Sequence, residues 1–268
     1  MENQCKPFLR WAGSKRKLLP ELTSYWSNDF KRYVEPFSGS ACLFFALKPK
    51  SALLNDTNKE LINTYEVIKK RPLEVYKELQ KIELGKENYY ALRAILPAQL
   101  TPIQRAARFI FLNRYCFNGL YRTNAKGIFN VPYAPSRTGQ LPSKEHLLAV
   151  SKSLYRKTVL SKDFEVILDK HTRPGDFVYL DPPYAVGNAR IFRQYGPNSF
   201  GIEDIERLKQ ALRRIDSRGI KFVLSYAESP ESLEAFQEWE VKRVYAQRNI
   251  AGFTKKRRKA TELIFTNI

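Results

Sequence analysis

Three short apolar runs organise this chain, because each one stops abruptly at an acidic position. They occupy residues 33–34, 52–54 and 178–180, and the acidic residues that close them are Glu35, Asp56 and Asp181. Short apolar runs bounded by turn residues are typical of strands buried in a parallel sheet. Ligands bind such sheets beyond the carboxyl ends of the strands. We therefore expect an α/β domain with acidic side chains at its ligand-binding edge.

The first two runs each lead through a turn into a helix. A tight turn at residues 38–40 precedes the apolar segment 41–47. After Asp56, apolar residues recur at helical spacing; they are Leu61, Ile62, Tyr65 and Ile68. Strand, turn, helix, strand and acidic residue in this order are typical of a nucleotide-binding α/β unit.

Residues 71–135 follow a different pattern, in which amphipathic helices replace strands. Thr101 and Pro102 are suited to the N-cap and first turn of one helix. Its predicted apolar face carries Ile103, Ala106, Ala107, Ile110 and Phe111. Asn-Gly and Lys-Gly turns with interleaved aromatic residues then indicate a basic hairpin or loop. We expect residues 71–135 to form a helical insertion in a domain made of 1–70 and 136–268, whose sheet closes with two antiparallel strands.

The charge of the chain favours a polyanionic partner. Lys and Arg number 46 against 27 Asp and Glu, for a net charge of +19, which attracts nucleic acid through counterion release. A generally basic protein without such a partner is the alternative.

No apolar run is long enough to span a bilayer, and no signal peptide or basic amphipathic membrane helix is evident. Three scattered cysteines and two histidines offer no disulfide framework, metal site or Ser-His or Cys-His catalysis. A cytoplasmic, monomeric protein is expected.

The stretch FVYLDPPYAVG, residues 177–187, places distinctive chemistry at a strand end. Pro182 and Pro183 cannot continue a sheet ladder, and they stiffen the loop after Asp181. The Asp181 carboxylate and the Pro182 carbonyl provide two acceptors, and Tyr184 provides a stacking face. This combination suits a planar group bearing an NH2, whose developing charge the two acceptors stabilise during reaction. The alternative is a simple turn after a strand.

Across nearly its whole length the chain resembles the Dam-type DNA adenine-N6 methyltransferases, the D12 class. The motifs that carry the resemblance are FLRWAGSK, VEPFSGS, NDTN, LNRYCFNGLYR with FNVPY, and DPPY. The resemblance implies a Rossmann-like methyltransferase fold with a helical target-recognition insertion, S-adenosylmethionine (SAM) as cofactor, double-stranded DNA as substrate and no metal. It also implies that the adenine is flipped out of the duplex to reach the cofactor.

The resemblance assigns the cofactor to several residues. Trp11 is expected to contact it, Lys15 to pair with its methionyl carboxylate, and Phe37 and Gly39 to pass beneath it. Asp56 is expected to accept hydrogen bonds from the ribose, and Asp181 to serve both cofactor and target amine. Two family glycines are replaced, by Ser14 and Ala41. We expect a slightly altered cofactor loop rather than a loss of binding.

The resemblance assigns target reading to a second group, and GATC is the expected site. These residues are Arg10, Phe117, Asn118, Leu120, Arg122 and Pro132. Phe117 would wedge into the duplex, and Arg10 would read a guanine, a contact that discriminates by ~1–3 kcal/mol. Arg105, Arg108 and Arg114 are expected either to hold phosphates or to form a solvated helix face. The basic run 255–259 is a further phosphate candidate, or else a charged loop tip.

Methyl transfer to N6 of a flipped adenine is the function that this reading predicts. In that reaction Asp181 and the Pro182 carbonyl bind the amino group while Tyr184 stacks on the base. Two alternatives stay open: an RNA adenine-N6 methyltransferase, which shares the catalytic motif, and a catalytically silent DNA-binding regulator. Whether the enzyme serves a restriction-modification system is left open by the sequence.

Overall fold

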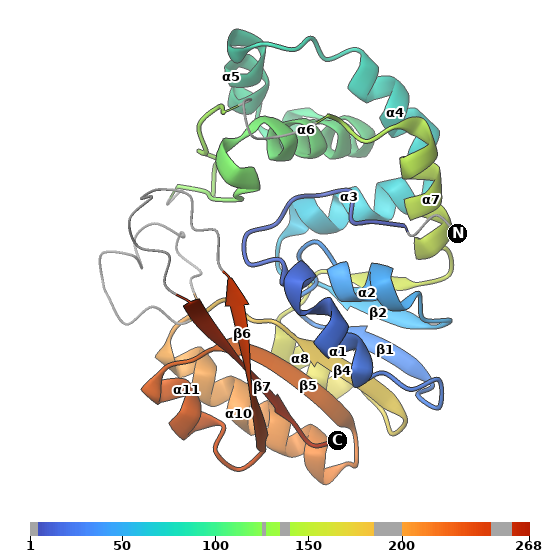
Figure 1. Cartoon of the computed structure of the whole chain (residues 1–268). Helices are drawn as coiled ribbons and strands as arrows, with labels where there is room; N and C mark the ends of the chain where they lie inside the picture. Colours follow the sequence, from blue (N-terminus) through green and yellow to red (C-terminus); the bar gives the residue numbers. More distant parts are fainter. Residues whose placement is uncertain (1–4, 125–126, 135–139, 185–199, 248–258) are drawn as a thin grey trace.

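A computed structural model describes residues 5–124, 127–134, 140–184, 200–247 and 259–268 (Figure 1). Its centre is a seven-stranded sheet in the order β3-β2-β1-β4-β5-β7-β6. The strands are β1 (Arg32–Glu35), β2 (Ala52–Asn55), β3 (Thr158–Leu160), β4 (Asp176–Leu180), β5 (Lys221–Ala227), β6 (Glu240–Gln247) and β7 (Lys259–Thr266). β1 to β5 pair in parallel and β7 runs antiparallel to both β5 and β6. The predicted Rossmann-like α/β sheet with a terminal antiparallel pair is therefore confirmed.

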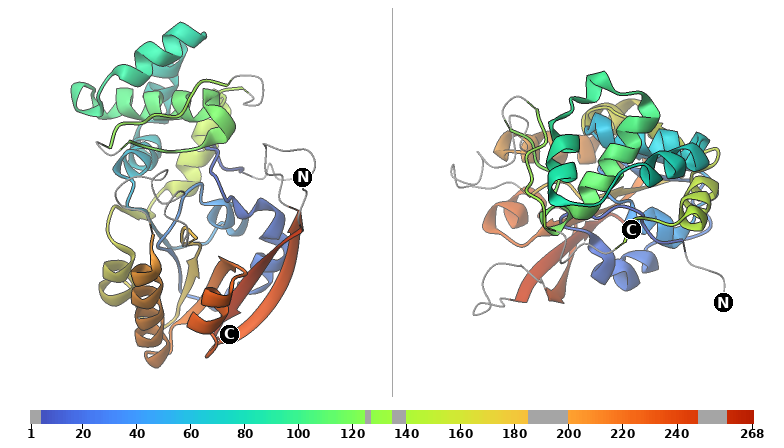
Figure 2. Two further views of the ribbon diagram at one scale, coloured as in Figure 1. Left: turned by 90° about the vertical axis from the view of Figure 1, so that its left-hand side faces the viewer. Right: turned by 90° about the horizontal axis from the view of Figure 1, so that it is seen from above.

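Helices flank the sheet and also form a separate layer beyond it (Figure 2). They are α1 (Leu19–Ser24), α2 (Cys42–Leu47), α3 (Lys59–Lys70), α4 (Pro72–Gln80), α5 (Lys86–Ala94), α6 (Pro102–Tyr115), α7 (Lys144–Leu154), α8 (Phe164–Lys170), α10 (Ile202–Ser217) and α11 (Pro230–Ala235). Short 3-10 turns span Lys15–Leu18, Pro97–Gln99 and Phe117–Gly119.

The alternation of side chains along the strands divides the core between the two faces of the sheet. On β4, Phe177 and Tyr179 join a core with α1, α2 and α3, whereas Val178 and Leu180 join a second core with α8, α10 and α11. This is the period-two pattern of a strand buried on both faces. The first core continues through α3 into α4, α5, α6 and α7, so the helical layer and the sheet share one apolar interior.

The helices with the most regular spacing of apolar residues are confirmed. All four apolar positions assigned to α3 are buried. The sequence also predicts a helix in which five apolar residues share one face, and these residues are buried on α10: Ile205, Leu208, Ala211, Leu212 and Ile215. Thr101 caps α6 by accepting a hydrogen bond from the Gln104 amide at 3.3 Å. Four described elements have no counterpart among the predicted ones: β3, three residues at the sheet edge, and the helices α7, α8 and α11.

The carboxyl ends of the parallel strands face the helical layer. The arrowhead of β6 points toward α3 and α6 in Figure 1. Because β6 and β5 are both antiparallel to β7, β5 and its parallel neighbours end in the same direction. The predicted ligand-binding edge therefore looks toward the helical insertion. Among the described residues, no helix is long and apolar enough to cross a membrane.

Candidate functional site

Three adjacent strands bring the predicted acidic residues to one edge. β1 lies between β2 and β4, so Glu35, Asp56 and Asp181 follow neighbouring strands. Burial raises the pKa of Glu35 well above its ordinary value; the Tyr33 hydroxyl opposes this increase, and the charges of Asp181 and Asp56 add to it. The carboxylates are therefore close enough to form one site.

Asp181 is held by a buried lysine from the start of the chain. The Lys15 Nζ lies 2.7 Å from Asp181 Oδ1 and donates to the Tyr184 hydroxyl at 2.7 Å and the Gly13 carbonyl at 3.3 Å. Its side chain is only 5% exposed. Burial by itself lowers the pKa of Lys15, but Asp181, Tyr184 and Glu262 outweigh it and raise that pKa. Lys15 is therefore a fixed cation among the catalytic candidates.

A hydroxyl on the neighbouring strand also reaches Asp181. Ser225 Oγ on β5 lies 3.3 Å from Asp181 Oδ1 and 3.0 Å from the Tyr179 hydroxyl. Burial raises the pKa of Asp181, while the charge of Lys15 and its hydrogen bond oppose the increase. Pro182 is buried and Pro183 exposed, so the loop reaches the surface at Pro183.

Glu262 is a site residue that the sequence reading missed. It lies on β7 and is 4% exposed. The Tyr184 hydroxyl contacts both its carboxylate oxygens, at 2.9 and 2.8 Å, and Lys15 Nζ lies 3.8 Å away. A signal was present in the sequence, since Glu262 is the one charged residue in the run TELIFT, residues 261–266. Ser225 gave no comparable signal.

Asp56 and Gly39 form the second part of the edge. Asp56 Oδ2 accepts the Gly39 amide at 3.0 Å, and Oδ1 accepts the Asn58 amide at 2.9 Å. Burial raises the pKa of Asp56, and these two amides oppose the increase. The Tyr65 hydroxyl donates to the Gly39 carbonyl at 2.8 Å. Each Asp56 oxygen keeps a second lone pair for further donors such as ribose hydroxyls.

Trp11 lies directly over Gly39. A Cβ built on Gly39 would stand 2.6 Å from Trp11 Cδ1, and the glycine has φ +45°, so no larger residue fits there. On the indole, the ring of Tyr121 stacks at 6.0 Å with a 15° tilt. Trp11 and Asp56 thus both contact Gly39, and we call these three residues the proposed cofactor wall.

The two positions where the family has glycine differ in backbone conformation. Ala41 has φ +50°, in the left-handed region that disfavours residues with a Cβ. Ser14 has φ −48°, an ordinary value. Ala41 therefore carries a local strain that glycine would avoid, whereas Ser14 carries none. Phe37 packs its ring on Phe164 at 5.3 Å and on Phe200 at 6.1 Å, on the side of the second core.

The N-terminal segment is fastened to the helical layer by Arg10. Asn113 on α6 accepts the Arg10 amide at 2.9 Å and donates to its carbonyl at 2.7 Å. A Cβ on Gly119 would stand 2.5 Å from the Arg10 Cβ. This contact brings Arg10 against the loop that holds the other predicted DNA-reading residues.

That loop, residues 116–134, is a hairpin-like excursion after α6, with bridges between Cys116 and Tyr133 and between Thr123 and Phe129. Its predicted reading residues gather at its open end. The Phe117 amide donates to the Pro132 carbonyl at 2.9 Å, and both side chains are exposed. Asn118 has φ +55° and Leu120 is half-buried.

Arg122 lies across the hairpin from Asn130. Its Nε donates to Asn130 Oδ1 at 2.8 Å, and its carbonyl accepts the Asn130 amide at 3.0 Å. The side chain is half-buried. The loop itself therefore orients the guanidinium through its Nε.

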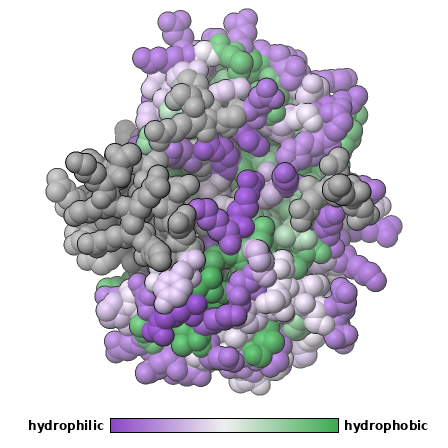
Figure 3. All heavy atoms as spheres, viewed as in Figure 1, coloured by the Kyte–Doolittle hydropathy of each residue, from purple (hydrophilic) through white to green (hydrophobic). Residues whose placement is uncertain are grey.

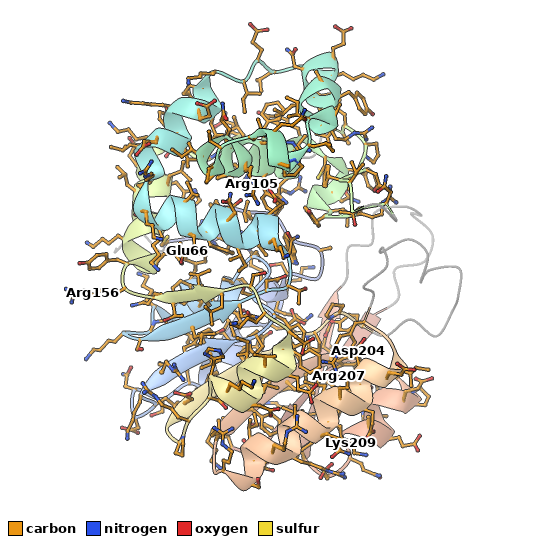
Figure 4. The ribbon with its side chains drawn as sticks, turned by 180° about the vertical axis from the view of Figure 1, so that it is seen from behind. Glu66, Arg105, Arg156, Asp204, Arg207 and Lys209 are labelled. Carbon is orange, nitrogen blue, oxygen red and sulfur yellow. The ribbon has the colours of Figure 1, made fainter. Side chains whose placement is uncertain are left out.

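The three arginines predicted for phosphates on α6 have partners inside the protein. Arg105 pairs with Glu60 on α3, and Figure 4 shows it between these two helices. Arg114 donates to the Phe8 carbonyl. Arg108 is 5% exposed and donates to the carbonyls of Leu92 at 3.0 Å and Arg93 at 2.9 Å. For Arg108 both expectations, a phosphate contact and a solvated face, are wrong, because α6 is enclosed by neighbouring helices.

The remaining phosphate candidate, the basic run 255–259, lies outside the described residues except for Lys259 at the start of β7. Among the coloured residues in Figure 3, hydrophilic and apolar ones both reach the surface. Within the described ranges, no group of three or more His, Cys, Asp or Glu side chains is placed to hold a metal ion.

Comparison with known proteins shows where this geometry belongs. The family model described as D12 class N6 adenine-specific DNA methyltransferase matches residues 11–250. The chain is 35% identical to the type II methyltransferase M1.LlaDCHI of Lactococcus lactis subsp. cremoris, over 98% of this chain and 95% of that protein. It is 33% identical to the type II methyltransferase M.MjaIII of Methanocaldococcus jannaschii, over 92% and 93%. It is 30% identical to the DNA adenine methylase of Escherichia coli (strain K12), over 97% and 94%. The chain belongs to the D12 class of N6 adenine-specific DNA methyltransferases.

Proposed function

We propose that this enzyme transfers the methyl group of SAM to N6 of an adenine flipped out of double-stranded DNA, within GATC. The observation that carries the proposal is the Asp181 carboxylate, fixed at the end of β4 by Lys15 and Ser225 beside the Tyr184 ring. An exocyclic amine is a poor nucleophile, and acceptors fixed in advance stabilise the positive charge that it develops.

The residues at the sheet edge fit SAM. Gly39 permits close backbone approach, Asp56 offers lone pairs to the ribose hydroxyls, and Trp11 offers an aromatic contact. SAM, when bound, supplies a methyl group on a sulfonium that is itself a good leaving group. Asp181 and Glu262 together carry one more negative charge than Lys15 neutralises, which suits a cationic ligand. Lys15 already donates to three acceptors, so pairing with a methionyl carboxylate requires one of these contacts to be exchanged.

The protein's own groups then account for the transfer step. Asp181 would accept one hydrogen of the target amine and the Pro182 carbonyl the other, which would orient the nitrogen lone pair for attack. When the new bond to N6 forms, the electrons of the broken bond would stay on the sulfur, and the extra proton on N6 would be released to water. The Tyr184 ring stacks on the base and holds it in that orientation. No covalent nucleophile is required, and positioning provides most of the rate enhancement.

Target reading is assigned to Arg10 and the loop 116–134. Arg10 is fastened to Asn113, and Arg122 is oriented by Asn130. Phe117, Asn118, Leu120 and Pro132 lie on the same loop. In this proposal residues 71–135 act as the recognition domain, and 1–70 with 136–268 as the catalytic domain. Two E. coli relatives and others at about 30% identity are named DNA adenine methylase, which supports GATC as the first site to test.

The decisive experiment maps the modified base. The protein is incubated with SAM and plasmid lacking adenine methylation, and modified positions are read by sequencing. We expect N6-methyladenine at GATC. Methylation of another sequence would refute the specificity alone; methylation of RNA only would favour the RNA enzyme. Binding of SAM and DNA without methylation would favour the silent regulator. Asp181→Ala should abolish transfer while DNA binding survives, and near-normal turnover would refute the role of Asp181.

Arg122 provides a separate test of base reading. In Arg122→Ala, discrimination at one base pair of the site should fall by ~1–3 kcal/mol, with a smaller effect on overall affinity. The measurement is binding to a panel of duplexes that each carry one substitution. An equal loss on every duplex would make Arg122 a phosphate contact instead.

A further inference from the structure

A carboxylate from the end of the chain reaches the catalytic tyrosine. Glu262 lies on β7, opposite Ala227 of β5 and Val244 of β6, and it is separated by 78 residues from the Tyr184 whose hydroxyl it contacts. Both carboxylate oxygens lie within 2.9 Å of that hydroxyl. A buried carboxylate with only 4% exposure is costly unless it is hydrogen-bonded, so its placement against Tyr184 is specific.

The Tyr184 ring is held from three directions. Its hydroxyl contacts Glu262, the Lys15 ammonium donates to the same oxygen at 2.7 Å, and Tyr226 packs edge-on at 5.3 Å. Since Lys15 donates to the Tyr184 oxygen, the hydroxyl hydrogen is available to Glu262. A tyrosine that stacks on a base needs its ring plane fixed, because a rotated ring would meet the flipped adenine at an edge.

Resting on the proposed function, we infer that Glu262 is a positioning residue for methyl transfer: it accepts the Tyr184 hydroxyl hydrogen and thereby fixes the ring that stacks on the target adenine. It acts through Tyr184 rather than on the reacting atoms. Its second contact, 3.8 Å from Lys15 Nζ, completes a chain of contacts from β7 through Lys15 to Asp181. The antiparallel terminal strand therefore contributes to the active site of the parallel part of the sheet.

The test compares single-turnover methyl-transfer rates at saturating DNA and SAM. Glu262→Ala should lower the rate about 10- to 100-fold, since it removes a hydrogen bond to a charged group, with the Kd for DNA within about twofold of wild type. Glu262→Gln keeps an acceptor for the hydroxyl and should stay within about fivefold of wild type. A wild-type rate in Glu262→Ala, or a loss in Glu262→Gln as large as in Glu262→Ala, would overturn the inference.

A double-mutant cycle separates positioning from general support of the fold. In the Tyr184→Phe background the hydroxyl is already absent, so Glu262→Ala should lower the rate by no more than about threefold further. A full additional loss would show that Glu262 acts by another route. Thr266→Val is the matched control, because Thr266 is also on β7, is 4% exposed and donates to the Phe222 carbonyl at 2.7 Å. It should lower the melting temperature without lowering the rate.

Failure of the inference is distinguishable from failure of the proposed function. If the wild-type protein does not methylate DNA at all, the proposed function fails. If the wild-type protein methylates DNA but Glu262→Ala keeps the wild-type rate, or the double-mutant cycle shows a full additional loss, only the role of Glu262 fails. If Glu262→Ala does not fold, the other two variants still test the inference. Tyr184→Phe should then lower the methyl-transfer rate, whereas Glu262→Gln should keep it close to that of wild type.

Discussion

The indole ring of Trp11 stacks on the phenol ring of Tyr121, with centroids 6.0 Å apart and planes tilted by 15°. Tyr121 stands in the sequence between Leu120 and Arg122, two predicted reading residues, and Trp11 lies over Gly39 in the proposed cofactor wall. This ring pair therefore joins the proposed recognition loop to the proposed cofactor site by direct contact.

Removal of the Tyr121 ring should weaken cofactor binding. Such aromatic pairs contribute about 0.5–1.5 kcal/mol beyond buried area, so Tyr121→Ala should raise the Kd for SAM about 2- to 12-fold by calorimetry. Tyr121→Phe keeps the ring and should stay within about twofold. Equal affinities in wild type and Tyr121→Ala would show that the stack does not support the proposed cofactor wall.

Gly39 and Gly13 form a matched pair of glycine tests. Both have positive φ, but a Cβ on Gly39 meets Trp11 at 2.6 Å whereas one on Gly13 meets nothing within 4 Å. Gly13→Ala should cost only the backbone strain, about 1–2 kcal/mol of unfolding free energy. Gly39→Ala adds the clash and should cost more, and it should also abolish SAM binding. If denaturant titrations showed the same loss of unfolding free energy for Gly13→Ala and Gly39→Ala, Trp11 would not be packed against Gly39 as described.

Glu35 should make stability depend on pH. Burial raises the pKa of Glu35 well above its ordinary 4.5; the Tyr33 hydroxyl opposes the increase, and Asp181 and Asp56 add to it. Its Oε2 has no hydrogen-bond partner among the described residues. The folded state therefore keeps the proton that the unfolded chain loses. The stability contributed by the neutral form is fully present below pH 4.5 and is lost as the pH rises through the raised pKa, by up to about 1.4 kcal/mol per pH unit.

Glu35→Gln removes this titration and provides the comparison. The unfolding free energy of wild type, minus that of Glu35→Gln, should be flat below pH 4.5 and should decrease above it. Asp56 and Asp181 titrate in both proteins, so their contributions largely cancel in the difference. Urea titrations from pH 4 to 9 measure it, and parallel pH profiles would contradict a raised pKa at Glu35.

Arg108 should act on stability and not on DNA binding. Arg108→Ala leaves the carbonyls of Leu92 and Arg93 without their donor and should cost about 2 kcal/mol or more. The salt dependence of DNA binding should not change, because a phosphate contact would contribute about one unit of slope. Arg156, exposed and 5.2 Å over the Tyr155 ring, is the control and should cost under about 1 kcal/mol. If DNA binding by Arg108→Ala depended less steeply on salt concentration than binding by wild type, Arg108 would contact a phosphate after all.

The sequence predicted the strands that are short continuous apolar runs and the helices whose apolar residues recur regularly. The runs 52–54 and 178–180, which precede Asp56 and Asp181, are apolar throughout because both faces of their strands are buried, and the apolar faces of α3 and α10 follow the helical period. α6 was only half predicted, because it is buried on more than one face and its arginines turn inward. Arg108 is buried against α5, where it donates to the Leu92 carbonyl. The spacing of apolar residues along the sequence does not reveal that α5 packs next to α6.

The candidate site was predictable where a motif is continuous and was missed where it is assembled by topology. Asp181 and Tyr184 stand within four residues of each other. Glu262 comes to Tyr184 only because β7 inserts between β5 and β6, a strand order that sequence adjacency does not reveal. Likewise, the pairing of Lys15 with Asp181 joins residues 166 positions apart by the path of the N-terminal segment.

The attachment of Arg10 to Asn113 has a consequence for engineering. Residues 10–15 touch the reading loop at one end and Asp181 at the other. A chimera that exchanged only residues 71–135 with those of a relative would leave the host's own Arg10 and Trp11 against a foreign Gly119 and Tyr121. Transfer of specificity between members of this family therefore requires two grafts, the insertion and the first fifteen residues, made together.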